Sequence, residues 1–245
     1  MNPSRLLPLL FGPSLALAAV SPEVSGDLKR WNTVTLSVEG PSARETDTRP
    51  NPFTDFRFEV VFTHETGQPS RRVPGYFAAD GQAAQTSATE GRVWRAHLSP
   101  DRAGRWDYEI HFAEGSGAAL EKGGGKAVEG LDGTRGSFTI TESPDAADPR
   151  QQGRLEYVGE RYLRWAGNGS RFLKVGPDAP ETLLAYADFD GTVARKKNVP
   201  LKTWGPHRQD WREGDPEWQG GRGRGLIGAV NYLAEKGMNT LSFLP

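Results

Sequence analysis

Alternation of apolar and polar residues between Trp31 and about Thr141 is the feature that most constrains the fold of this chain. In the stretch RWDYEIHF, residues 105–112, aromatic and aliphatic side chains take every second position and polar side chains lie between them. The same period of two recurs in residues 57–62 and 94–98. Successive side chains of a strand point to opposite faces of its sheet, so this pattern predicts half-buried antiparallel strands.

These strands predict an all-β, immunoglobulin-like sandwich over residues 28–142. Further strands are expected at Thr33–Val38, Arg72–Phe77 and Ser137–Thr141. The turn sequence SPDRAG, residues 99–104, predicts a hairpin between the strands on either side of it. About seven short strands joined by turns are typical of this fold. The Gly- and Ala-rich stretch from Glu114 to Gly136 predicts a long surface loop.

Composition narrows the possible functions. The formal net charge of −1 gives no electrostatic reason to expect nucleic acid or an acidic membrane as a partner. The absence of cysteine excludes disulfides, thiolate metal sites and cysteine nucleophiles. The length of 245 residues is enough for one large or two ordinary domains with real cores. A fraction of 36% hydrophobic residues is that of a globular protein.

The N-terminus predicts export. A basic residue at position 5 precedes the apolar run LLPLLFGPSLALA, which ends in small residues at Ala16 and Ala18. Residues 1–18 are therefore predicted to be a secretory signal peptide, with a disordered apolar tail as the alternative. A protein exported in this way is secreted or periplasmic, comes from a bacterium, and has no membrane partner after the signal is cleaved.

The patterning changes after a predicted linker at residues 143–150. Residues 151–176 contain three short strand candidates, and a polar loop rich in Gly, Pro and Trp covers about 177–222. GLIGAVNYLAEKG, residues 225–237, has helical periodicity, and a strand is expected from Asn239. Strand, loop, helix and strand make one β-α-β unit of a parallel sheet or barrel. A lone unit cannot cover both faces of its strands, so the sequence is expected to be truncated at Pro245.

Three motifs in this second region suggest functions that their context does not support. Asp-Phe-Asp-Gly-Thr at 188–192 looks like the nucleophile motif of haloacid dehalogenase phosphatases, but no suitably spaced acidic pair follows it. As a calcium loop it has Val199 where a bidentate Glu is needed. GRGLIGA at 223–229 fits a dinucleotide-binding pattern, but the polar stretch before it cannot be the required buried strand.

Longer stretches resemble a known family of secreted bacterial proteins. The sequences NPFTDFRFEVVFTHETG, VPGYFAADG and WRAHLSPDRAGRWDYEIHF are similar to an N-terminal sandwich domain of unknown function that precedes a glycoside-hydrolase-like TIM barrel. GRLEYVGERYLRWAGNGSRFLKVGPDAPETLLAYADFDGT and GDPEWQGGRGRGLIGAVNYLAEKGMN are similar to the start of that barrel. The resemblance covers about residues 28–245. It implies a carbohydrate-active enzyme with no cofactor, of which residues 151–245 are the first part of the barrel.

The long loop is the expected substrate site, because it leaves the C-terminal end of the first predicted barrel strand. Aromatic rings stack on the apolar faces of sugars while carboxylates bind the hydroxyl groups. The candidate substrate-binding residues are Asp188, Asp190, Trp204, His207, Asp210, Asp215 and Trp218. The alternative is that these aromatic residues pin the loop and the acids cap turns. No catalytic residue is assigned, because the carboxylate pair is expected on later strands, and no metal ligand is assigned either.

Three functions remain in competition. The first is a glycoside-hydrolase-like protein acting on poly- or oligosaccharide, of which this fragment is expected to be inactive. The second is a non-catalytic carbohydrate-binding or cell-surface sandwich module. The third, an acid phosphatase, predicts phosphate release that depends on Mg²⁺ and is lost in Asp188→Asn.

Overall fold

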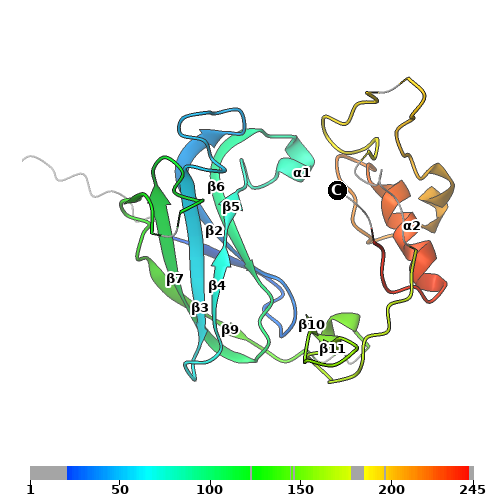
Figure 1. The fold of residues 1–245 in the computed structure, drawn as a ribbon, viewed down its shortest axis with the longest axis horizontal. Coiled ribbons are helices and arrows are strands. Elements are labelled where there is room, and N and C mark those ends of the chain that lie inside the picture. Colours follow the sequence, from blue (N-terminus) through cyan, green and yellow to red (C-terminus); the bar gives the residue numbers. More distant parts are fainter. Residues whose placement is uncertain are drawn as a thin grey trace, which may run out of the picture.

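A computed structural model describes residues 21–121, 123–143, 145, 147–177, 185–195 and 197–242. The predicted signal peptide, residues 1–18, lies outside the described residues. Antiparallel strands fill the chain as far as Ile140, and the residues after 150 form a second region with few regular elements (Figure 1).

Two sheets make up the first region. One has the order β1-β2-β6-β5, with β1 at Glu23–Gly26, β2 at Val34–Arg44, β6 at Glu90–Leu98 and β5 at Tyr76–Phe77. The other runs β4-β3-β7, with β4 at Ser70–Pro74, β3 at Phe56–His64 and β7 at Gly104–Glu114. The strands β8 (Lys126–Ala127) and β9 (Arg135–Ile140) both pair with β7. The pairings between these strands are antiparallel, and one core lies between the sheets, so the prediction of a β-sandwich is confirmed.

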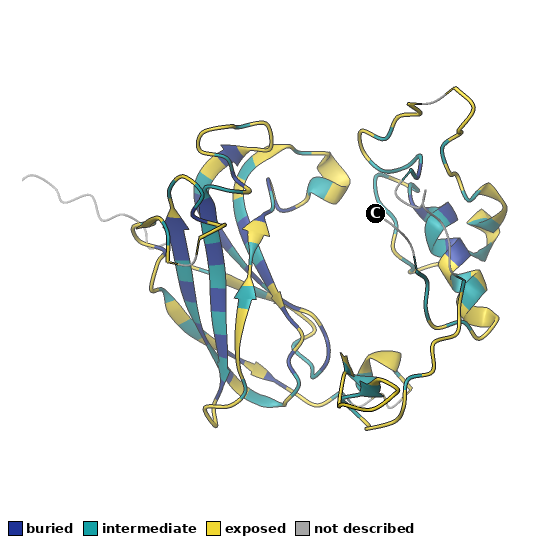
Figure 2. Cartoon of the chain, viewed as in Figure 1, coloured by how far each residue is buried: buried dark blue, intermediate teal, exposed yellow. Residues whose placement is uncertain are grey.

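The core follows from the alternation in the sequence. Buried residues alternate with partly or fully exposed ones along most of β2, β3, β6 and β7 (Figure 2). Trp94 is 1% exposed, and its ring centroid lies 5.0 Å from those of Phe56 and Phe112 in the facing sheet. Each fully buried side chain of this size contributes about 1.5–3 kcal/mol. The aromatic cluster is therefore the main source of stability in the sandwich.

The predicted hairpin across residues 99–104 is wrong. β6 pairs with β2 and β5, whereas β7 pairs with β3, β8 and β9, so the connecting turn crosses from one sheet to the other. The Trp31 N–H donates to the Pro100 carbonyl at 2.8 Å and helps to hold this crossing. Alternation indicates which face of a strand is buried, but it does not indicate which sheet the strand joins.

The strand predicted at Arg72–Phe77 is divided between the sheets in the same way. β4 and β5 belong to different sheets, and Gly75 lies between them. The Gly75 N–H donates to the Phe58 carbonyl at 2.7 Å, and a Cβ there would overlap the Phe58 ring. The sequence also did not predict β1, or the short β8 inside the expected loop between residues 114 and 136. A short helix, α1 (Ala83–Thr86), follows β5.

The chain leaves the sandwich through a 3-10 turn, η1 (Pro149–Gln152), which is capped by the Asp148 side chain. Beyond it, Gly153 lies against the Trp31 ring so closely that a Cβ would overlap it. The Arg154 guanidinium lies over the same ring, 5.7 Å from its centroid. These contacts attach the connecting segment to the sandwich. The domain boundaries predicted from the sequence stay predictions.

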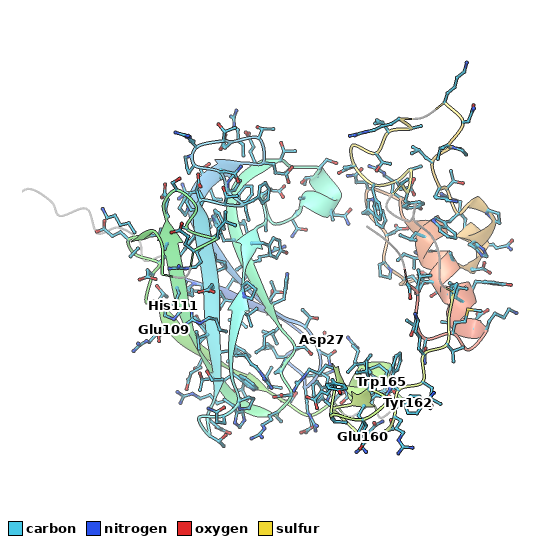
Figure 3. All side chains as sticks on the ribbon, in the orientation of Figure 1. Asp27, Glu109, His111, Glu160, Tyr162 and Trp165 are labelled. Carbon is cyan, nitrogen blue, oxygen red and sulfur yellow. The ribbon has the colours of Figure 1, made fainter. Side chains whose placement is uncertain are left out.

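The second region contains a small antiparallel hairpin, a second 3-10 turn and one long helix. The hairpin strands are β10 (Leu155–Glu156) and β11 (Arg164–Trp165), the turn is η2 (Gly205–Asp210), and the helix is α2 (Arg224–Glu235). The helix confirms the prediction for residues 225–237. Trp165 and Tyr162 belong to the compact hairpin segment beside the lower end of the sandwich (Figure 3). Between residues 151 and 242, the described part of this region forms no barrel, so the barrel stays a prediction.

Small residues explain how α2 packs. Gly225, Gly228 and Ala229 are the buried residues of the helix. A Cβ on Gly225 would overlap the carbonyl of Thr203, and one on Gly228 would overlap the carbonyl of His207. The glycines therefore let the backbone around η2 approach the helix. The segment before the helix is the Trp218–Arg222 turn rather than a strand, which argues against dinucleotide binding.

Candidate functional site

Asp188 lies against the N-terminus of α2. Its Oδ2 accepts hydrogen bonds from the Tyr186 hydroxyl at 2.7 Å and from the Gly223 N–H at 2.8 Å. Gly223 is the residue directly before the helix, where an N–H group has no partner within the helix and the helix dipole favours negative charge. The Asp188 carboxylate therefore joins its own segment of the loop to the N-terminus of α2.

These contacts shift the pKa values of both side chains. Burial alone would raise the pKa of Asp188, but the hydrogen bonds from Gly223 and Tyr186 outweigh it and the pKa is lowered. Tyr186 is fully buried, and burial together with its bond to Asp188 raises its pKa to about 12. At neutral pH Asp188 is therefore ionised and Tyr186 is a neutral hydrogen-bond donor.

Trp218 completes this cluster from the opposite side of the loop. Its Nε1–H donates to the Asp188 carbonyl at 3.1 Å. Its ring stacks on Phe189 with a centroid distance of 5.9 Å and an angle of 13°, and it lies edge-on to Tyr186 at 6.4 Å. Paired backbone hydrogen bonds between Trp218 and Arg222 close a tight turn that sets the position of the indole.

Asp190 lies next to this turn and is more accessible. Its Oδ1 accepts from Arg222 Nη1 at 2.9 Å, and its side chain is 49% exposed. Hydrogen bonds from Ser87 and then Arg222 lower the pKa of Asp190. This carboxylate is ionised, and about half of its surface can accept hydrogen bonds from a ligand.

The sandwich reaches this cluster through α1 and the residue after it. Gln85 Oε1 accepts from the Gln219 N–H at 2.8 Å, and Gln219 Nε2 donates to Ser87 Oγ at 2.6 Å. Gln219 also bonds to Arg222, which holds Asp190. Figure 1 shows α1 on the side of the sandwich that faces the second region. The two regions therefore meet at the Trp218–Arg222 turn.

His207, Asp210 and Asp215 form a second group beside the middle of α2. His207 Nδ1 lies 2.9 Å from Asp210 Oδ2, and its ring packs on Tyr232 of the helix at 4.9 Å. Asn231 Nδ2 donates both to the Asp210 carbonyl at 2.9 Å and to Asp215 Oδ2 at 2.7 Å. Bonds from the Arg212 N–H and Asn231 lower the pKa of Asp215. These groups tie η2 and the following turn to the helix.

Trp204 stands at the start of η2 with a φ of 50°, in the left-handed region. Its Nε1 is buried and has no hydrogen-bond partner among the described residues. Its carbonyl lies beside Gly225 of α2. The Trp204 carbonyl also accepts a hydrogen bond from the His207 N–H at 2.9 Å, so the backbone of Trp204 is joined to the second group.

The seven candidate residues therefore divide into sets. Asp188, Asp190 and Trp218 come together at the start of α2. His207, Asp210 and Asp215 lie along its side, and Trp204 joins this second set through its backbone bond to His207. A general acid needs a raised pKa, whereas every shifted carboxyl pKa here is lowered. The arrangement suits binding of hydroxyl groups rather than proton donation.

Several residues of this site were missed in the sequence. Tyr186, Gln219, Arg222 and Ser87 all contact the candidate carboxylates or their partners. The sequence WQGGR offers a signal, because two glycines between Trp218 and Arg222 favour a tight turn that pairs them. Ser87 lies on the other region of the chain, and no local pattern connects it to Asp190.

Over the described ranges, no group of three or more His, Cys, Asp or Glu side chains is placed to hold a metal ion. In the same part of the chain, no helix combines the length and apolar character needed to cross a bilayer.

Comparison with known proteins identifies one domain. Residues 27–113 match the model of a family described as "Domain of unknown function (DUF5060)". This match confirms the predicted resemblance of the first region to a domain of unknown function. The match lies within the sandwich, from the residue after β1 into β7, and covers less than half of the chain. No curated protein matches the chain.

One solved structure with similarity to the chain is a "putative glycoside hydrolase" from Bacteroides vulgatus ATCC 8482. The identity is 20% and the TM-score is 0.39 over 60% of this chain, which is too loose a superposition to support an argument. This chain spans 21% of the length of that protein.

Proposed function

We propose that this chain is the N-terminal part of a secreted, carbohydrate-active, glycoside-hydrolase-like protein that acts on poly- or oligosaccharide. In this proposal an immunoglobulin-like sandwich precedes the first part of a TIM barrel, and the loop between residues 177 and 222 contributes to the substrate site. The main observation in favour of this proposal is that two segments, which are connected through α2, run parallel to each other.

Those segments are residues 173–177 and 239–242. The Asn239 N–H donates to the Val175 carbonyl at 2.8 Å, and the Ser242 N–H donates to the Pro177 carbonyl at 3.3 Å. The residue numbers rise together along both segments, so the segments run parallel. A Cβ on Gly176 would overlap the Thr240 carbonyl, which shows how closely the backbones approach.

A parallel pair requires a crossover connection, which is usually helical. Here the connection contains the long loop and then α2, the order expected for one β-α-β unit of a barrel. Active sites of such barrels lie at the C-terminal ends of the strands. A loop that follows Pro177 therefore starts at the end of the sheet where substrate would bind.

Asp190 and Trp218 are the residues of this loop that we assign to substrate binding. Asp190 is half exposed and ionised, and Trp218 lies beside it on the turn that Arg222 closes. Asp188 is assigned to positioning, because its Oδ2 is occupied by Tyr186 and Gly223. The catalytic carboxylates, which lie about 5–5.5 Å apart in retaining and about 6.5–9.5 Å apart in inverting glycosidases, belong to later strands in this proposal.

The proposal also covers where the protein is located and whether it needs a cofactor. Residues 1–18 act as a signal peptide, so the protein is secreted or periplasmic. Hydrolysis of glycosidic bonds by two carboxylates needs no redox cofactor.

The test uses the product of the complete coding frame, assayed for release of reducing ends from soluble polysaccharides. Asp190→Asn and Trp218→Ala are expected to raise KM about tenfold with a smaller change in kcat, because binding residues act on ground and transition states alike. Glu213→Gln, an exposed carboxylate of the same loop, is the matched control. Active enzyme with an unchanged KM in both variants would contradict the assignment of the site.

A second candidate function is carbohydrate binding by the sandwich without catalysis. The observation in its favour is that the buried core cluster lies wholly between Val34 and Ile140, so the sandwich has its own core. Pulldown of residues 28–142 on insoluble polysaccharide would support this candidate. Hydrolysis by the complete protein together with no pulldown would reject it.

A further inference from the structure

An unassigned groove runs around one edge of the sandwich. It begins beside Gly75, where the chain crosses from β4 to β5. A hollow of about 190 Å³ lies between this crossing and the loop before β3. A second hollow of about 610 Å³ continues over the outward face of β3. The hollows share Arg57, Glu59 and Ala119 in their linings, so they adjoin, and together they are called the groove.

Phe53 and Tyr76 provide aromatic surface at the first hollow. Their side chains are 55% and 46% exposed, and both line the hollow. Single exposed apolar residues are common on protein surfaces and need no explanation. Two aromatic residues that border one hollow differ from that background, because together they add aromatic surface to its rim.

Hydrogen bonds hold the backbone at Phe53 and the side chain of Tyr76. Asn51 Oδ1 accepts from the Phe53 N–H at 2.8 Å, and Asp55 Oδ2 accepts from the Asn51 N–H at 2.9 Å, which fixes the loop. The Tyr76 hydroxyl lies 3.0 Å from His97 Nε2. The loop that carries Phe53 and the Tyr76 ring are thus positioned before any ligand binds, which lowers the entropic cost of binding.

Charged side chains of both signs line the second hollow. Arg72 Nη1 donates to Glu59 Oε2 at 2.9 Å, and Arg57 Nη1 donates to the Glu121 carbonyl at 2.9 Å. His111 is the cross-strand neighbour of Glu59 and, with Glu109, lies on the outward side of β7 (Figure 3). Two arginines and two glutamates line this hollow, so it offers donors and acceptors without a net charge.

We propose that this groove is a carbohydrate-binding site for a neutral oligosaccharide chain. The apolar faces of sugar rings pack on Phe53 and Tyr76, and hydroxyl groups bond to Arg57, Glu59 and Arg72. An apolar wall with a few fixed polar groups is the usual make-up of a small-molecule site. The balanced charge favours neutral sugars over uronic acids. Every residue of this site belongs to the sandwich, so the site is separate from the loop assigned to the hydrolase, and the inference rests on the second candidate function, carbohydrate binding by the sandwich, for which it names the site.

Native gel electrophoresis of the purified chain tests this proposal. The gels contain laminarin, hydroxyethyl-cellulose, galactomannan or xylan as neutral probes, and polygalacturonate as the anionic probe. We expect at least one neutral polysaccharide to retard the chain. Phe53→Ala and Tyr76→Ala should each raise the apparent Kd about tenfold, as expected for truncation of a ring that anchors a ligand. Tyr157→Ala removes an aromatic ring that is 77% exposed outside the groove and should leave binding unchanged.

Three results would overturn the proposal. The first is no retardation by any neutral probe, the second is retardation by polygalacturonate alone, and the third is equal weakening by Tyr157→Ala and the groove variants. Matching circular dichroism spectra and thermal midpoints of the variants exclude misfolding as the cause of lost binding. Retardation in the gel does not require hydrolysis. The gel result therefore does not depend on whether the complete protein is a glycoside hydrolase.

Discussion

Asp188 Oδ2 accepts hydrogen bonds from groups far apart in the sequence, the Tyr186 hydroxyl and the Gly223 N–H. The same residue accepts the indole N–H of Trp218 at its carbonyl. A carboxylate that accepts two hydrogen bonds is held more strongly than a neutral acceptor would be. Asp188 is therefore the residue on which the order of the candidate site depends most.

Asp188→Ala should loosen the start of α2. The substitution leaves the buried Tyr186 hydroxyl without an acceptor and the Gly223 N–H without its partner, at a cost of about 1–3 kcal/mol for a stranded polar group. Amide hydrogen exchange at Gly223 should become about tenfold faster or more. Glu213→Ala is the control, and Tyr186→Phe combined with Asp188→Ala should recover part of the loss. Unchanged exchange in Asp188→Ala would contradict the role given to this carboxylate.

Tyr186 should make stability fall at high pH. Its pKa is raised from 10.0 to about 12 in the folded chain, because burial and Asp188 disfavour the phenolate. A raised pKa stabilises the fold fully below the unfolded value, and this contribution is lost as pH rises through the folded value. The expected window of loss is therefore between about pH 10 and pH 12.

An ultraviolet titration of phenolate ionisation measures this directly. The chain has six tyrosines, and Tyr186→Phe should remove a component that titrates near pH 12. A titration that loses only a component near the ordinary tyrosine pKa would show that Tyr186 is not buried against Asp188.

At the scale of elements, α2 depends on close contact with η2. Gly228→Ala would raise helix propensity by about 1 kcal/mol in an isolated helix. Here the added methyl would meet the His207 carbonyl, and overpacking of this kind costs about 1–3 kcal/mol. We therefore expect a net loss of stability of the second region in a denaturant titration followed by tryptophan fluorescence.

Val230→Ala is the matched control for that variant. Val230 lies on the same helix and is 49% exposed, so the substitution removes little packing. The control should be neutral or slightly stabilising. A stabilising effect of Gly228→Ala would mean that the backbone of η2 does not press on the helix.

The sequence predicted strands and faces better than it predicted pairing. Alternation located β3, β6 and β7, because burial of every second residue is a local property of a strand. Sheet membership depends on contacts between distant strands, which is why the β6–β7 hairpin and the single strand over Arg72–Phe77 were wrong. The crossing at Gly75 is recognisable only when the Phe58 ring is known to occupy the place of a Cβ.

The sequence likewise predicted only part of the candidate site. The spacing of Asp188 and Asp190 placed them together, and the aromatic residues of the loop suggested Trp218 as a neighbour. The Arg222 ion pair and the contact with Ser87 depend on how the turn and the sandwich approach each other. No local sequence pattern indicates which distant segments lie close together, so Arg222 and Ser87 were not predicted from the sequence.

At the scale of the whole molecule, the regions differ in how much core they contain. Of the buried hydrophobic residues among those described, only Tyr186 and Ala229 lie after residue 150 (Figure 2). Leu173 and Val175, on the segment parallel to residues 239–242, are more than half exposed. In a parallel sheet both faces of a strand are normally covered. The second region therefore has apolar side chains that further elements of a barrel would bury.

The sandwich should fold without the second region. Its core cluster uses only residues between Val34 and Ile140, so a polypeptide of residues 21–142 should unfold in one cooperative transition. Trp31 loses the cover of Gly153 and Arg154 in this polypeptide, so its fluorescence should shift to longer wavelength. Calorimetry and near-ultraviolet circular dichroism check the first expectation. A polypeptide without fixed tertiary structure would show that the sandwich needs the second region.

Reading the coding DNA beyond the codon for Pro245 would show whether the second region begins a parallel barrel that carries a carbohydrate site. A barrel of this type takes about 250 residues, and 95 positions lie from 151 to 245, so we expect an open frame of roughly 150 or more further codons. That frame should contain repeated strand and helix patterns with carboxylates at strand ends. A stop codon directly after Pro245 would contradict the barrel, and with it the hydrolase function.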